Sequence, residues 1–100
     1  MFGLTESALL FRRIGQQGGA PAYADAGIAC VCRTEPAFGR SFSGSSAERT
    51  VDTRIYLRVE VGTGDRVQTG GMRYEVADVS VCRAFGAVHH YEALCRAVSE

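Results

Sequence analysis

The stretch that decides the fold is VDTRIYLRVEV, residues 51–61. Its odd positions are apolar apart from Thr53, and its even positions are charged apart from Tyr56. This alternation predicts a β-strand and excludes an amphipathic helix, whose period is about 3.6 residues. Burial of each apolar side chain gains roughly 1.5–3 kcal/mol, which nearly cancels the roughly 1–2 kcal/mol that ordering each residue costs. The strand therefore needs a sheet around it and a second layer over its apolar face.

Several neighbouring segments predict the rest of this sheet. Residues 27–34 (GIACVCRT) are apolar on both faces, which is typical of a central strand. Residues 66–68 form a short strand, and Thr69-Gly70-Gly71 is the tight turn of a hairpin that continues into the alternating segment from Met72. The alternation slips by one residue near Ala77–Asp78, which predicts a β-bulge.

The two ends of the chain are less regular. Residues 7–14 (SALLFRRI) fit a strand or a short helix, and residues 15–26 form a turn-rich connection. Residues 88–98 (VHHYEALCRAV) fit either a helix or a strand, and we favour a strand because a barrel needs a closing partner. The chain as a whole predicts one mainly β domain over residues 1–100. We expect a small five- to six-stranded, partly open β-barrel or sandwich with one long loop.

The long loop is predicted at residues 37–50, AFGRSFSGSSAERT, after Pro36 ends the preceding strand. Connections in compact domains have a median length of roughly 4–6 residues, and much longer ones are usually functional. Phe38 and Phe42 lie inside the segment, although a pure linker does not need aromatic residues. We therefore expect this loop to become ordered against a partner.

The composition argues against several classes of protein. Eleven basic residues balance eleven acidic ones, whereas a free-standing nucleic-acid-binding domain usually carries a basic excess. No apolar run reaches the roughly 20 residues of a membrane helix. The N-terminus lacks the basic-then-apolar order of a secretory signal. We expect a protein made in the cytosol, with no membrane partner and with reduced cysteines.

No residue pattern predicts catalysis, a cofactor or a metal. The serines of the long loop lack a GxSxG setting, and no nucleophile and base are placed together by local spacing, so we expect no enzyme activity. Cys30 and Cys32 are spaced as CxC and His89–His90 are adjacent, which are not the usual zinc-ligand spacings. A zinc site remains an alternative to the simpler expectation that the cysteines act as small core residues.

The polar face of residues 51–61 has two interpretations. It carries Arg54, Tyr56 and Arg58 between Asp52 and Glu60. Alternating charge around one aromatic residue fits a solvated sheet face. It fits a subunit interface equally well, because Tyr and Arg are the preferred anchors of interfaces. Arg54, Tyr56 and Arg58 are therefore the candidate interface residues.

A longer pattern resembles a known family. The segment Gly64-Asp65-Arg66-Val67, the pair Gly70–Gly71 and the segment Tyr74-Glu75-Val76-Ala77-Asp78-Val79 resemble head–tail connector proteins of tailed bacteriophages, of the head-completion or stopper kind. In order of elements the resemblance extends over residues 6–98. It implies a small β-barrel that assembles with its own copies into a ring in the virion neck. The ring would lie below the portal and adaptor, close the head, retain packaged DNA and provide the attachment site for a tail terminator or tail tube.

The resemblance also implies a role for the long loop. Stoppers project a loop into the DNA channel, and the matching segment is residues 37–50, with the candidate channel residues Phe38, Arg40, Phe42 and Arg49. Arg40 and Arg49 would face DNA, through non-specific contacts, or a neighbouring subunit. The balanced charge fits this role, because tight phosphate contacts would hold the DNA back. The protein would be found in the virion neck, and in the host cytoplasm during assembly.

Two other functions stay open. The first is a small-barrel binding module, either a protein adaptor or an OB-like nucleic-acid domain. An OB-like domain needs exposed aromatic residues beside basic ones, as Tyr56 lies beside Arg54 and Arg58. The second is another phage part, a tail or baseplate subunit that shares the barrel.

Overall fold

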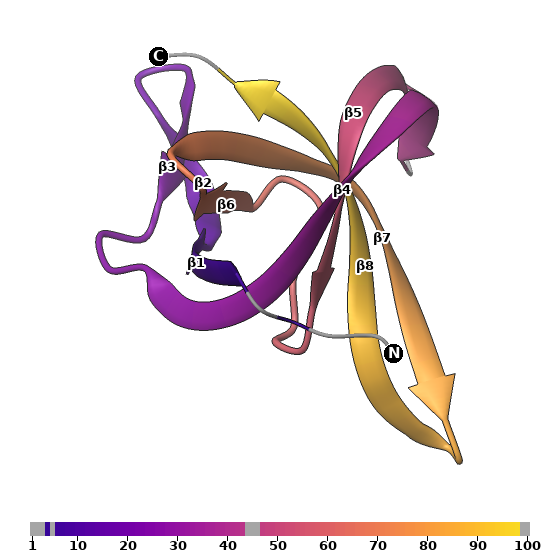
Figure 1. Cartoon of the computed structure of the whole chain (residues 1–100). Coiled ribbons are helices and arrows are strands. Elements are labelled where there is room, and N and C mark those ends of the chain that lie inside the picture. The colour runs from indigo at the N-terminus through magenta and orange to yellow at the C-terminus, as the bar shows by residue number, and fades with distance from the viewer. Residues whose placement is uncertain (1–3, 5, 44–46, 99–100) are drawn as a thin grey trace.

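The computed structural model of the chain is a closed antiparallel β-barrel with a small two-stranded sheet beside it (Figure 1). It describes residue 4 and residues 6–43 and 47–98, and of residues 17, 38–43 and 47–50 it describes the backbone alone. In order around the wall, the barrel strands are β1 (Glu6–Phe11), β4 (Ile28–Ser43), β5 (Ala47–Leu57), β8 (Ala87–Val98), β7 (Met72–Ala84) and β6 (Arg66–Thr69). The separate sheet pairs β2 (Arg13–Gln17) with β3 (Ala20–Tyr23).

The predicted mainly β fold is confirmed. The barrel is closed rather than partly open because β1 pairs on both sides. Leu9 lies opposite Ala29 of β4 on one side and opposite Gln68 of β6 on the other. Among the described residues, no helix is long and apolar enough to cross a membrane.

The barrel interior is small and is filled by inward-facing residues of the wall. Ile55 and Leu57, from the apolar face of the deciding strand, are fully buried. Cys32 and Cys95 are buried just as completely, which confirms for these two that cysteine serves as a small core residue. All four cysteines are free thiols. Burial raises the pKa of the Cys95 thiol to about 12, so this thiol stays neutral inside the core.

The strand predicted at residues 51–61 begins and ends earlier in the chain than predicted. β5 begins at Ala47 and ends at Leu57 rather than at Val61. The chain bends at residues 58–59, and Val61 is buried although it lies outside any strand. Arg58 is consequently exposed beyond the end of β5. The alternation continued past the strand because the bend still directs Val61 into the core.

The predicted loop at residues 37–50 is wrong for the part that the structure describes. β4 continues through Pro36 to Ser43 and pairs with β5, from Gly39 opposite Val51 to Ser43 opposite Ala47. Residues 44–46 of the predicted loop lie outside the described residues. Pro36 does not end the strand, for two reasons. A β-bulge follows it directly. In addition, β1 pairs with β4 only as far as Cys32, so on the side of β4 that faces β1 there is no hydrogen-bond ladder at Pro36 to interrupt.

The other predictions have mixed outcomes. Residues 7–14 divide into two strands at Arg12, and the turn-rich segment 15–26 contains the whole of β3. The C-terminal segment is a strand, as favoured. The β-bulge near Ala77–Asp78 is confirmed, because the pairing passes from Val76 opposite Cys95 to Asp78 opposite Leu94.

The side chain of Asp65 forms hydrogen bonds that stabilise the barrel where β1 and β6 meet. Its side chain accepts hydrogen bonds from the backbone N–H groups of Arg13 and Gly62, both at 2.9 Å, and from the Arg12 guanidinium at 3.3 Å. Its backbone carbonyl accepts a hydrogen bond from the N–H of Val76 at 2.9 Å. The carboxylate is buried, so these donors replace the water that it loses. One side chain thereby joins the end of β1, the turn at residues 62–65 and, through its backbone, β7.

We expect Asp65→Ala to lower the free energy of unfolding by about 2–3 kcal/mol, because it leaves donors near the barrel closure without their charged acceptor. Urea denaturation followed by circular dichroism measures this loss. Asp25→Ala is the matched control, since Asp25 is exposed in the connection before β4, and it should change stability by less than about 0.5 kcal/mol. Equal stability of the two variants would contradict the role given to Asp65.

Candidate functional site

A stripe of polar side chains crosses four strands on the outer face of the barrel. Every second residue of a strand points to the same face, so β4, β5, β7 and β8 each contribute to it. Arg54 lies opposite Glu35, Tyr56 opposite Glu92, and Cys82 opposite His90. We call this set the outer stripe: Arg33, Glu35, Arg54, Tyr56, Cys82, His90 and Glu92.

The outer stripe is a continuous chain of contacts. The Tyr56 hydroxyl donates to Glu35 Oε1 at 2.7 Å, and an Arg54 terminal nitrogen donates to the same oxygen at 3.1 Å. Arg54 Nε forms an ion pair with Glu92 Oε1 at 3.1 Å. The other oxygen of Glu92 accepts from the Cys82 thiol at 3.4 Å.

These contacts shift the pKa values of the groups involved. The hydrogen bond from Tyr56, supported by Arg54, lowers the pKa of the Glu35 carboxyl. Desolvation, and then the hydrogen bond to Glu35, raises the pKa of Tyr56. Desolvation and the bond to Glu92 raise the pKa of the Cys82 thiol. At neutral pH the stripe therefore holds an ionised Glu35 carboxylate beside a neutral phenol and a neutral thiol.

The structure places the three candidate interface residues differently. Arg54 and Tyr56 are half-buried members of the stripe, and Arg58 lies beyond the end of β5. Both carboxylates around Arg54 were missed as its partners, because only the strand register brings Glu35 and Glu92 beside it. The positive charge of Arg54 is neutralised within the chain. The stripe is therefore better suited to packing against a neutral surface than to holding phosphate.

The four candidate channel residues lie on the arm, which we define as the paired backbone of residues 39–43 and 47–51, or at its base. Arg40 and Phe42 are in β4 and Arg49 is in β5, while Phe38 lies in the bulge before Gly39. The structure describes only their backbones. The arm continues beyond the region where β5 pairs with β8, which runs from Thr53 to Leu57.

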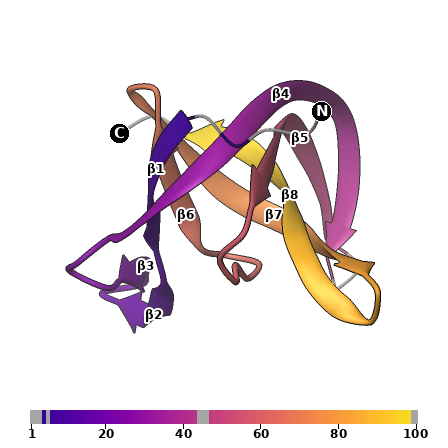
Figure 2. The ribbon, with the colours of Figure 1, turned by 60° about the horizontal axis from the view of Figure 1, so that its bottom comes forward.

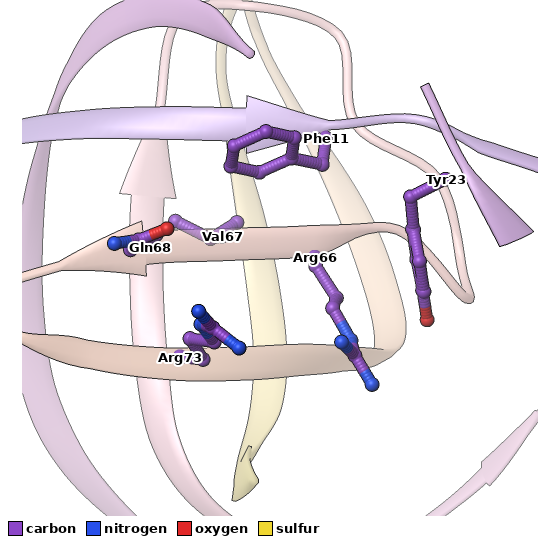
Figure 3. Close-up of a pocket in the computed structure, with 6 residues that line it drawn as sticks. All are labelled: Phe11, Tyr23, Arg66, Val67, Gln68 and Arg73. Atoms are coloured by element: carbon purple, nitrogen blue, oxygen red, sulfur yellow. The ribbon is translucent and has the colours of Figure 1, made fainter. Parts of the chain in front are cut away.

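A shallow pocket lies where β1, β3, β6 and β7 approach one another (Figure 3). Phe11 and Tyr23 supply apolar surface beside the buried Val67. Arg66 lies over the Tyr23 ring, 4.5 Å from its centroid. The remaining wall consists of Gln68 and Arg73. Its volume of about 180 Å³ is below the roughly 300–1,000 Å³ of small-molecule sites. The pocket therefore fits one inserted side chain better than a cofactor.

Phe85 lies at the opposite end of the molecule from this pocket. It occupies the tip of the β7–β8 hairpin, whereas Tyr23 and the β2–β3 sheet lie at the other end (Figures 1 and 2). The ring of Phe85 is fully exposed and its φ of +52° is in the left-handed region. That region costs a bulky residue free energy, and Asn or Gly is preferred in a two-residue turn of this kind. The turn itself therefore does not explain why the residue is Phe.

In comparisons with known proteins, no family model matches the chain and no curated protein matches it in sequence. The features that bear on function are therefore those of the chain itself. They are the outer stripe, the arm, the pocket and Phe85.

The lowered pKa of Glu35 predicts a pH dependence of stability. The carboxylate is stabilised in the folded state, so its contribution is present above the ordinary glutamate pKa of about 4.3 and is lost as the pH falls through the lower folded value. We expect Glu35→Gln to be less stable than the wild type at pH 7, with a difference that shrinks below about pH 4. Urea midpoints between pH 7 and pH 3 measure it. Glu60→Gln, at an exposed position, should follow the wild type, and parallel curves for Glu35→Gln and the wild type would contradict the prediction.

Proposed function

We propose that the chain is a structural subunit of the tailed-phage neck. It would form a ring below the portal and adaptor, close the head, retain packaged DNA and receive the tail. The arm would serve as the element that reaches the channel. The resemblance over residues 64–79 suggests the family. The arm is the structural observation that supports the proposed role.

The arm is a two-stranded ribbon that extends beyond the barrel wall. In the described part of the chain, no third strand pairs with residues 39–43 or 47–51. An isolated two-stranded hairpin is marginally stable in water. Apart from Val51, which is buried at its base, an arm of this kind contributes little to the barrel and gains its stability by packing against another molecule. This property is expected of an assembly part and not of an enzyme or of a small monomeric adaptor.

Phe85 and the pocket supply a contact between neighbouring copies. They lie at opposite ends of a molecule whose longest extent is 43 Å. An aromatic side chain from one copy that enters the pocket of the next makes a head-to-tail contact, and such contacts close into rings when the rotation between copies allows it. Arg66 stacked on Tyr23 provides the cation and aromatic surface that interfaces prefer.

The OB-like alternative has less support. Single-stranded nucleic acid needs exposed aromatic faces and free cations along a groove. Tyr56 hydrogen-bonds to Glu35 and its ring lies against His90, with 5.8 Å between the ring centroids. Arg54 is paired with two carboxylates. The stripe would have to break these bonds before it could bind a phosphate.

Shortening the arm tests the proposed function. Removing residues 41–47 joins Arg40 to Glu48, and since Arg40 pairs with Thr50, changing Glu48-Arg49 to Asn-Gly makes a two-residue hairpin turn. We expect the free energy of unfolding to stay within about 0.5 kcal/mol of the wild type. In a phage that carries this variant, heads should form but lose their DNA.

The control for this experiment keeps the full arm and carries Ser41→Ala, and it should retain DNA normally. Unfolding of the shortened variant would show that the arm is part of the barrel. Full DNA retention would overturn the channel role. The neighbouring genes give an independent test, because portal and capsid genes on one side and tail genes on the other are required by the proposal.

A second prediction concerns Phe85. We expect Phe85→Asn to stabilise the isolated subunit by about 0.5–1 kcal/mol, because Asn adopts positive φ more readily. The same change should weaken assembly of the ring, measured by sedimentation velocity alone and in the presence of the phage portal complex. Val81→Asn is the matched control, since Val81 is an exposed apolar residue of the same hairpin. Normal assembly of Phe85→Asn would rule out the proposed contact.

A further inference from the structure

The geometry points to a transition-metal site in the outer stripe, formed by Cys82, His90 and Glu92, and we propose that it binds zinc. One ligand atom from each residue lies within 4.8 Å of the others. All three residues are half-buried. The inference is independent of the proposed neck function, because its three ligands all lie on the β7–β8 hairpin.

The strand register explains why these residues meet. Cys82 of β7 lies directly opposite His90 of β8, and Glu92 lies opposite Ser80. His90 and Glu92 are two positions apart on one strand and so point to the same face. Cys82 is the diagonal neighbour of Glu92 on that face. The register of β7 and β8 shifts directly after this pair, between Cys82 and Arg83.

The separations are close to those that zinc requires. Zinc bonds of about 2.0–2.3 Å in a tetrahedral site place the ligand atoms roughly 3.5 Å apart. The Cys82 sulfur already lies 3.4 Å from Glu92 Oε2. The 4.8 Å bound on the set therefore needs a closure of at most about 1.3 Å, which small side-chain rotations supply.

The chemistry of the three donors selects the metal. A thiolate, an imidazole and a carboxylate form a mixed set that suits Zn²⁺ and related ions, whereas Mg²⁺ and Ca²⁺ require oxygen ligands. On binding, the Cys82 thiol gives its proton to solvent and its sulfur forms the bond to the metal. Three protein ligands leave a fourth position for water or for a group from another molecule.

A surrounding shell holds the ligands in place. Glu92 would bind the metal through Oε2 while Oε1 stays paired with Arg54 at 3.1 Å. Arg54 is in turn fixed by Glu35. Nδ1 of His90 lies 2.9 Å from Nδ1 of His89, a contact that orients its ring. Outer partners of this type set the orientation and basicity of metal ligands.

Cobalt binding tests the site directly. Reduced, metal-free protein is titrated with Co²⁺, and we expect one ion per chain with the near-ultraviolet absorption of a cobalt–thiolate bond, which added Zn²⁺ then abolishes. Cys82→Ser should remove that absorption. His90→Ala and Glu92→Gln should each weaken binding by more than the roughly 10–100-fold that follows loss of an outer-shell partner.

Cys30→Ser is the matched control, because Cys30 is a half-buried thiol of β4 outside the cluster, and it should bind cobalt as the wild type does. Zn²⁺ should raise the melting temperature of the wild type and of Cys30→Ser, but not that of Cys82→Ser. Persistence of the thiolate band in Cys82→Ser, or its absence from the wild type, would overturn the proposal. If Cys82→Ser does not fold, the two β8 variants still decide the outcome.

Discussion

The closure of the barrel depends on the buried carboxylate of Asp65. β6 is only four residues long, and it is the strand through which the wall returns to β1. A ladder this short is easily frayed, and the two chain segments that it joins are far apart in sequence. Asp65 supplies what the ladder lacks, because it accepts hydrogen bonds from the N–H of Arg13, just beyond β1, and from that of Gly62 in its own turn. Its donors come from both sides of the seam, so the carboxylate is stable in the interior only when the seam is closed.

Two β-bulges, each formed by one extra residue, have opposite effects on their strands. The bulge between Val76 and Asp78 places Val76 and Ala77 together in the interior, which tightens the bend of β7 around the core. The bulge between Pro36 and Gly39 lies where the paired strands β4 and β5 leave the barrel wall and continue as the arm. At the base of the arm, Asp52 accepts a hydrogen bond from the backbone N–H of Ala97, next to the last pair of β5 and β8. The backbone N–H of Ala97 therefore has an acceptor at the point where the pairing of β5 with β8 stops. The arm can leave the wall there without leaving this donor of β8 unsatisfied.

The sequence predicted those parts of the fold in which alternation reflects burial on one side. The hairpin from Arg66 and the bulge near Ala77 followed from that pattern. The strand at residues 88–98 was favoured for a different reason, the need of a barrel for a closing partner. The arm could not be predicted in this way, because the sequence of residues 37–50 carries no sustained alternation of apolar and polar residues. The partners of Arg54 were also inaccessible, since alternation fixes the face of a residue but not the register of its strand. The same limit hid the grouping of Cys82, His90 and Glu92, whose spacing along the chain is unlike that of zinc-binding motifs.

The charged groups of the outer stripe are paired within the chain, and this property bears on both a subunit interface and a bound metal. Covering a charged surface with another protein costs desolvation free energy, which hydrogen bonds across the interface only partly recover. In this stripe Glu35 and Glu92 have already exchanged much of their water for Arg54 and Tyr56. A neighbour could therefore pack over Arg54 and Tyr56 at a lower cost than over the same residues unpaired. A metal held by Cys82 and Glu92 would add to this effect, because it would neutralise the remaining carboxylate oxygen and stiffen the hairpin close to the tip that carries Phe85. An interface built on these residues would gain its strength from a rigid, internally neutralised surface and not from new ion pairs between subunits.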